Sequence, residues 1–124
     1  MEKQKIKSFT DLTAWKEAHI LVLMIYEITK DFPKEEIFVL VAQIRRSVVS
    51  ISSNIAEGFS RKTKKEKEQF YHTSLGSTTE LQNQLLISRD LSYISQEKFL
   101  KIADQTVKVS KLVNGLIKSS CDHT

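Results

Sequence analysis

A short basic segment holds the side chains in this sequence that are best suited to bind a polyanion. Residues 61–67 read Arg-Lys-Thr-Lys-Lys-Glu-Lys, so five cations accompany one acid. Lysine and arginine contact phosphate oxygens, which gives affinity without sequence specificity. The nearby Tyr71 and His72 could stack on bases or form hydrogen bonds with them. The segment predicts a nucleic-acid-binding patch of Arg61, Lys62, Lys64, Lys65 and Lys67. The alternative is a charged run that is simply solvated.

A polar strip is the second unusual feature. Projecting residues 34–57 at 100° per residue places six polar residues on one stripe, beside an apolar stripe: Gln43, Arg46, Ser47, Ser50, Asn54 and Glu57. One interpretation is a boundary strip, in which long polar side chains cover the edge of the core. The other is a buried or interfacial network in which Arg46 and Glu57 neutralise each other through amide and hydroxyl groups. We favour the network, because isoleucine and valine lie directly beside the strip.

A run of small residues offers this strip a partner. Residues 76–80 read Gly-Ser-Thr-Thr-Glu, which is a poor sequence for the middle of a helix. Small side chains let another helix approach closely, and they bring Glu80 within reach of the strip. We therefore expect a structural polar network of Gln43, Arg46, Ser50, Asn54, Glu57, Ser77 and Glu80.

No set of residues in the sequence matches a catalytic or metal-binding pattern. The histidines His19, His72 and His123 form no His-x-x-x-His or Glu-x-x-His pair of the kind that binds metal in helical bundles. The single cysteine, Cys121, has no base assigned to it, and no glycine-rich phosphate loop is present. We expect no enzyme activity, no catalytic residues, no metal and no cofactor, and we identify no small-molecule substrate.

The composition is that of one soluble domain. A chain of 124 residues is too short for two stable domains, and 40% hydrophobic against 27% charged residues is typical of a globular protein. One proline and three glycines argue against a β-sandwich or a Rossmann fold. A single cysteine and the lack of an apolar leader favour the cytoplasm, with no membrane contact. The net charge of +4 permits a polyanionic partner without requiring one.

Hydrophobic periodicity predicts an all-α fold. Apolar residues recur at steps of three and four in each segment, and the apolar stripe of the second segment starts at Ile37. Short connections make sequential helices antiparallel, so we expect a single domain, an up-down-up-down four-helix bundle over residues 1–124. The predicted helices cover residues 11–31, 34–57, 63–91 and 95–118, with frayed ends at 1–8 and 119–124.

Polar residues and a glycine predict where these helices begin and end. Thr10 or Asp11 can cap the first helix, whereas Thr63 and Ser95 can cap the third and the fourth. Gly58 is expected to end the second helix, because glycine is common just after a helix.

The strip and the basic segment fall within a longer pattern of motifs. It comprises Phe9-x-x-Leu12-x-x-Trp15, Phe32-Pro33, Gln43-Ile-Arg45-Arg46, Ser50-Ile-Ser-Ser-Asn54-Ile-Ala-Glu57-Gly58, Arg61 and Gly76-Ser77-x-x-Glu80-Leu81. Over residues 8–117 the sequence resembles the four-helix bundle protein family, also called the 23S ribosomal RNA intervening-sequence protein or S23 family. The motif from Ser50 to Gly58 is specific.

This resemblance implies an antiparallel four-helix bundle that assembles into a homopentameric ring in a bacterium. A related group, the accessory proteins of diversity-generating retroelements, binds nucleic acid through a basic pentameric surface. The family has no established enzymatic activity, and the strip coincides with its motif positions, which favours the structural network. We therefore expect a cytoplasmic, non-enzymatic pentamer that binds RNA or another nucleic acid through basic residues. The alternative is a structural or protein-interaction scaffold without nucleic-acid binding.

Overall fold

Four long helices account for most of the described chain. The structure, a computed structural model, describes residues 5–122. These residues contain no strand, and their helices, two of them single 3-10 turns, are η1 (Phe9–Asp11), α1 (Thr13–Thr29), η2 (Lys34–Glu36), α2 (Leu40–Ser60), α3 (Lys64–Asp90) and α4 (Gln96–Asp122). The predicted all-α fold is confirmed.

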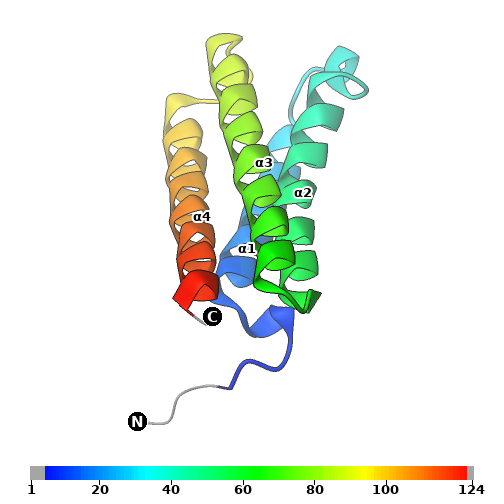
Figure 1. The fold of residues 1–124 in the computed structure, drawn as a ribbon. Coiled ribbons are helices and arrows are strands. Elements are labelled where there is room, and N and C mark those ends of the chain that lie inside the picture. The colour runs from blue at the N-terminus through cyan, green and yellow to red at the C-terminus, as the bar shows by residue number, and fades with distance from the viewer. Residues whose placement is uncertain (1–4, 123–124) are drawn as a thin grey trace.

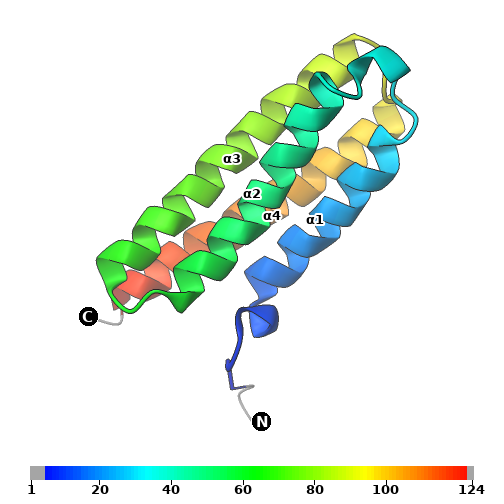
Figure 2. The ribbon, with the colours of Figure 1, turned by 90° about the vertical axis from the view of Figure 1, so that its right-hand side faces the viewer.

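The four long helices pack side by side with alternating direction (Figure 1). Each contacts two neighbours in the cyclic order α1, α2, α3, α4, which is the predicted up-down-up-down arrangement (Figure 2). The α2–α3 connection therefore lies at the same end of the bundle as the start of α1 and the end of α4 (Figure 1). We call this the α2–α3 end, and we call the other the opposite end.

The core is built from the apolar stripe of each helix. Branched aliphatic side chains fill it along its length, and they are almost completely buried: Leu21 and Ile25 on α1, Ile44, Val48, Ile51 and Ile55 on α2, Leu81 and Leu85 on α3, and Val109 and Val113 on α4. Burying each such side chain contributes roughly 1.5–3 kcal/mol. This apolar core holds the surface residues in fixed positions.

The second helix starts later than predicted. Residues 34–36 form η2, in which Ile37 N donates to Lys34 O at 3.2 Å, and α2 begins only at Leu40. Val39 adopts φ −117° and ψ −94°, which lies outside the helical region and separates the two elements. Ile37, which the periodicity placed on the apolar stripe, is 47% exposed as a result.

Two helices run further than predicted. Helix α2 continues through Gly58 to Ser60. The ring of Tyr71 fills the space where a side chain at Gly58 would lie. This glycine therefore permits packing and does not end the helix. Helix α4 continues to Asp122, so residues 119–122 are helical, contrary to the prediction of a frayed end. The same prediction for residues 1–4 and 123–124 lies outside the described residues.

The predicted caps of the third and fourth helices are confirmed. Thr63 and Ser95 each accept a hydrogen bond of 3.2 Å from the backbone N–H three residues later. At the N-terminus the prediction is wrong: Ser8 caps η1, and neither Thr10 nor Asp11 caps α1. The Asp11 carboxylate instead accepts from Ser8 N at 3.1 Å, which closes a capping box one turn earlier.

Candidate nucleic-acid interface

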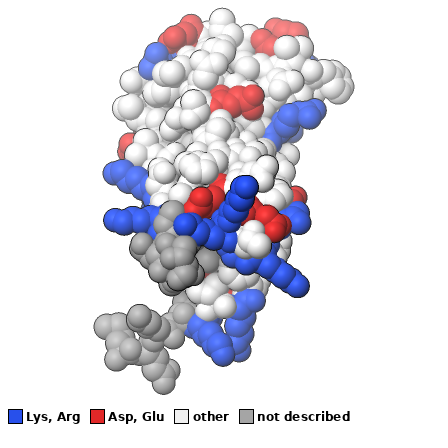
Figure 3. Space-filling view, viewed as in Figure 1, with Lys and Arg blue, Asp and Glu red and all other residues white. Residues whose placement is uncertain are grey.

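Basic side chains gather at the α2–α3 end of the bundle. In Figure 3 most of the Lys and Arg side chains lie over the lower half of the molecule, whereas the upper half is largely uncharged or acidic. The basic segment lies at this end because α2 stops at Ser60 and α3 starts at Lys64, so the connection is a tight turn. Helix α4 also ends at this end of the bundle, and its second half carries Lys111 and Lys118.

Three of the five predicted basic residues are free. Lys62, Lys64 and Lys65 are exposed, and none of them forms an ion pair or a hydrogen bond within the described part of the chain. Their ammonium groups can therefore contact a phosphate without first leaving a partner.

The other two predicted basic residues are held by the fold. Lys67 Nζ donates to Phe59 O at 2.7 Å, where it satisfies a carbonyl at the C-terminus of α2. Arg61 pairs with Glu57 at 3.4 Å and lies over the ring of Phe70, 4.7 Å from its centre. Both side chains therefore belong to the contact between α2 and α3.

A cleft opens beside the basic segment. Its volume is about 440 Å³, and its lining comes from the N-terminal segment and from α2, α3 and α4. Lysines stand with aromatic and aliphatic side chains in this lining: Ile6, Leu12, Phe59, Lys62, Lys64, Lys67, Tyr71, Leu116 and Ser119. Of the two residues that the sequence proposed for contacts with bases, Tyr71 is buried in this lining and His72 is exposed on α3.

The centre of the predicted polar network is present between α2 and α3. Ser47 Oγ donates to Glu80 Oε1 at 2.7 Å, and the hydroxyls of Ser50 and Ser77 share a hydrogen bond of 2.7 Å. Asn54 Nδ2 donates to Ser50 O at 2.8 Å and to Ser50 Oγ at 3.1 Å. Serine hydroxyls and the Glu80 carboxylate thus connect the two helices that make the most extensive contact in the bundle. The Asn54 amide bonds within α2.

Three other members of the predicted network are not part of it. Gln43, Arg46 and Glu57 are exposed in the single chain, and the Glu57 carboxylate pairs with Arg61. The expected neutralisation of Arg46 by Glu57 is therefore wrong within the chain, because the two residues lie eleven positions apart along the same helix. Gly76 also has open space, since a Cβ there would meet nothing within 4 Å.

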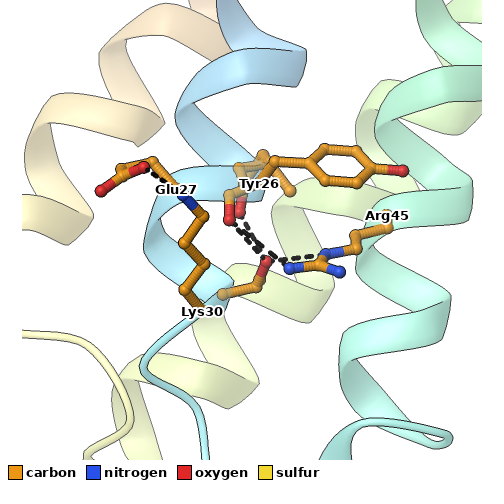
Figure 4. Close-up of polar contacts among 6 residues, drawn as sticks. Tyr26, Glu27, Lys30 and Arg45 are labelled. Carbon is orange, nitrogen blue, oxygen red and sulfur yellow. Dashed lines mark hydrogen bonds and ion pairs between the residues drawn. The ribbon is translucent and has the colours of Figure 1, made fainter.

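Arg45 stabilises the packing of α2 against α1, a role that the spacing argument did not predict. Its guanidinium lies 4.5 Å from the centre of the Tyr26 ring, and its Nε donates to Thr29 Oγ1 at 2.9 Å (Figure 4). The Thr29 hydroxyl in turn donates to Ile25 O at 2.7 Å. Arg45 therefore joins α2 to the last turn of α1. The 100° projection could have found it, because it places Arg45 on the side of α2 opposite the polar strip.

The described residues lack both a membrane-spanning helix and a metal-binding cluster. None of the helices in residues 5–122 has the length and apolar character needed to cross a membrane. Among the same residues, no three His, Cys, Asp or Glu side chains are grouped so that they could hold a metal ion.

Comparison with known proteins finds a matching family in sequence and similar folds among solved structures. Residues 10–115 match the family described as 23S rRNA-intervening sequence protein. The fold is similar to the crystal structure of a protein of unknown function from the S23 ribosomal protein family of Bacteroides thetaiotaomicron, with a TM-score of 0.78. That protein is 24% identical, and the alignment covers 85% of this chain and 95% of that chain. At this identity the likeness concerns the fold alone. A comparison with curated proteins found no match.

Proposed function

Because this chain belongs to the 23S rRNA-intervening sequence protein family, we propose that it binds RNA and catalyses no reaction. RNA contacts the α2–α3 end of the bundle through the free lysines Lys62, Lys64 and Lys65. The protein acts in the cytoplasm as a homopentameric ring, which presents five copies of this end together.

The three free lysines are the observation that carries this proposal. Surface cations commonly pair with neighbouring carboxylates, whereas Lys62, Lys64 and Lys65 have no partner within residues 5–122. Each ammonium group that contacts a phosphate displaces a condensed counterion, and the released counterions drive the association. The family description refers to ribosomal RNA, so RNA is the polyanion that we propose.

Exposed apolar side chains on two opposite faces support the ring. On the α1–α2 face, Tyr26 and Val49 border a shallow hollow of about 450 Å³, and Leu23 is 58% exposed on the same side. On the α3–α4 face, Leu86 and Val107 line an apolar groove of about 200 Å³. Because the two faces differ, they can only join head to tail, and such a contact closes into a ring when the rotation fits.

A ring of this kind strengthens the binding of a polyanion. Rotational symmetry about one axis places all five α2–α3 ends at equivalent positions. A net charge of +4 per chain becomes five times larger, or +20, for the whole assembly. Several weak phosphate contacts made by one assembly then act together, because each one raises the effective concentration of the next.

Measurement of RNA affinity against salt concentration tests the proposal. The variant with Lys62, Lys64 and Lys65 changed to Gln should bind RNA more weakly, and its salt slope should flatten by about 0.7–0.9 units per lost contact. The matched control changes Lys34, Lys98 and Lys101, at the opposite end, to Gln. It removes the same charge and should retain both the affinity and the slope. RNA that copurifies from the native host identifies the target by sequencing.

A protein-interaction scaffold is the second candidate, and one observation favours it. Phe38, in the connection between η2 and α2, is 92% exposed, and its neighbour Val39 is 60% exposed. An exposed apolar tip of this kind is typical of a docking surface. A ring that carries no nucleic acid at physiological salt, and whose salt-dependent affinity does not respond to the lysine changes, would favour the scaffold.

A further inference from the structure

The cleft beside the basic segment contains a buried tyrosine without a hydrogen-bond partner. Tyr71 is only 3% exposed, and its ring packs against Gly58. Its ring is buried, whereas its hydroxyl is not among the buried unpaired polar atoms and forms no hydrogen bond with any described residue. The hydroxyl is protonated and can donate at neutral pH, since burial only raises the pKa of Tyr71 further above its ordinary value of 10. This residue lines the cleft, which leaves the hydroxyl available to a ligand.

The remaining walls of the cleft suit a flat, largely apolar group. Leu12, Phe59 and Leu116 supply apolar surface, and Lys62 and Lys64 stand in the same lining. The volume of about 440 Å³ falls within the roughly 300–1,000 Å³ range of small-molecule sites. The lining also offers the hydroxyls of Tyr71 and Ser119, and the ammonium groups of Lys62 and Lys64 are free. Such a pocket matches a nucleobase that is joined to its phosphates.

We propose that this cleft binds one unpaired nucleotide of an RNA strand. The base lies between the apolar walls, the Tyr71 hydroxyl bonds to the edge of the base, and Lys62 and Lys64 contact the flanking phosphates. This inference rests on the proposed RNA-binding function and narrows its substrate to strands with unpaired bases. A base inside a duplex is stacked and paired, so it cannot enter the cleft unless it leaves the helix.

Fluorescence anisotropy with labelled RNA tests the inference. The probes are a single-stranded RNA, a duplex of the same length and a single strand that carries abasic sites. The wild-type protein should bind the single strand about tenfold more tightly than the duplex or the abasic strand, consistent with the ~1–3 kcal/mol measured for base stacking on proteins.

A conservative variant isolates the role of the hydroxyl. Tyr71→Phe keeps the ring on Gly58 and removes only the oxygen, so the fold should be retained. It should weaken single-strand binding about 2- to 10-fold, the range for one hydrogen bond, and leave the duplex affinity and the salt slope unchanged. Tyr93→Phe is the matched control: it removes a tyrosine hydroxyl that donates to Glu36 at the opposite end, and it should leave the affinity for every RNA unchanged.

The possible results distinguish a failure of the cleft site from a failure of the proposed RNA binding. Equal affinity for single strand, duplex and abasic strand would overturn the cleft site and leave the lysine contacts standing. An unchanged affinity in Tyr71→Phe would do the same. A free mononucleotide that binds as tightly as the strand would also overturn it, since the ligand would then be a soluble nucleotide. Failure of every RNA to bind would contradict the proposed function itself.

Discussion

Gly58 and Tyr71 approach each other so closely that a Cβ at position 58 would lie 2.5 Å from Tyr71 Cε1 and 2.8 Å from Cδ1. Real Cβ atoms do not come this near to another carbon, so only glycine fits here. The glycine sits inside α2, and the tyrosine sits inside α3. Their contact fixes how closely the two helices meet at the end of the bundle that carries the basic segment.

The first prediction concerns this contact. Gly58→Ala should lower the free energy of unfolding by about 1–3 kcal/mol, because the buried Tyr71 ring must shift. Gly115→Ala is the matched control: a Cβ there meets nothing within 4 Å, so the better helix propensity should raise stability by about 0.5–1 kcal/mol. Chemical denaturation measures both. Equal effects of the two changes would contradict the packing argument.

The second prediction compares two adjacent arginines on α2. Arg45→Lys removes the hydrogen bond from Nε to Thr29 and the planar contact with Tyr26, so it should cost about 1 kcal/mol of stability. Arg46→Lys should cost less than about 0.5 kcal/mol, because Arg46 is exposed and forms no hydrogen bond or ion pair in the described chain. Thermal unfolding distinguishes them. A larger loss for Arg46→Lys would indicate that Arg46 lies at a contact between subunits.

The third prediction concerns the ring. Light scattering should give a mass five times that of the 14.3 kDa chain. Val107→Glu places a charge in the α3–α4 groove and should dissociate the ring, because an unpaired buried charge is strongly unfavourable. Leu91→Glu, which follows α3 at the opposite end, is the control and should leave the mass unchanged. A wild-type protein that stays monomeric at micromolar concentration would refute the assembly.

The fourth prediction concerns acid stability. Gln105 Nε2 donates to Glu17 Oε1 at 3.0 Å, and Lys108 lies 3.2 Å from the same oxygen. The hydrogen bond from Gln105, followed by Lys108, lowers the pKa of Glu17 below its ordinary value of 4.5. The stabilisation is therefore fully present above that ordinary value and is lost as the pH falls through the lowered pKa.

Two variants check this linkage. Glu17→Gln should be less stable than the wild type at neutral pH, and the difference in melting temperature should shrink as the solution is acidified. Gln105→Ala should reduce the same pH dependence, because it removes the main donor to the carboxylate. A difference between Glu17→Gln and the wild type that stays constant with pH would mean that the ionised carboxylate contributes nothing.

The sequence predicted the helices well where periodicity alone decides, and less well where tertiary contacts decide. The core positions followed from steps of three and four, and Thr63 and Ser95 followed from local capping chemistry. Gly58 was misassigned as a helix end, because its role depends on Tyr71, thirteen positions later. The break at Val39 depends on backbone angles that the residue type at this position does not predict.

The candidate site likewise contains features that the sequence predicted and features that depend on tertiary contacts. Composition identified the basic segment, but it could not separate the free Lys62 from Lys67, whose ammonium group is bound to a carbonyl of α2. The pairing of Ser50 with Ser77 agrees with the predicted network, whereas Arg46 and Glu57 were grouped with it by angle alone. A helical projection gives direction around the axis and ignores distance along it, which is why that pair was wrong.

The concentration of lysines at the α2–α3 end gives the molecule a permanent electric moment. Antiparallel helices cancel one another's backbone dipoles in pairs, so the side chains determine the moment along the bundle axis. The electric field of a polyanion exerts a torque on the molecule, which turns the lysine-rich α2–α3 end toward the polyanion before any contact forms. In a ring whose axis lies along the bundles, the axial components of five copies add and the transverse components cancel. Transient electric birefringence should therefore find the assembly aligned along its symmetry axis.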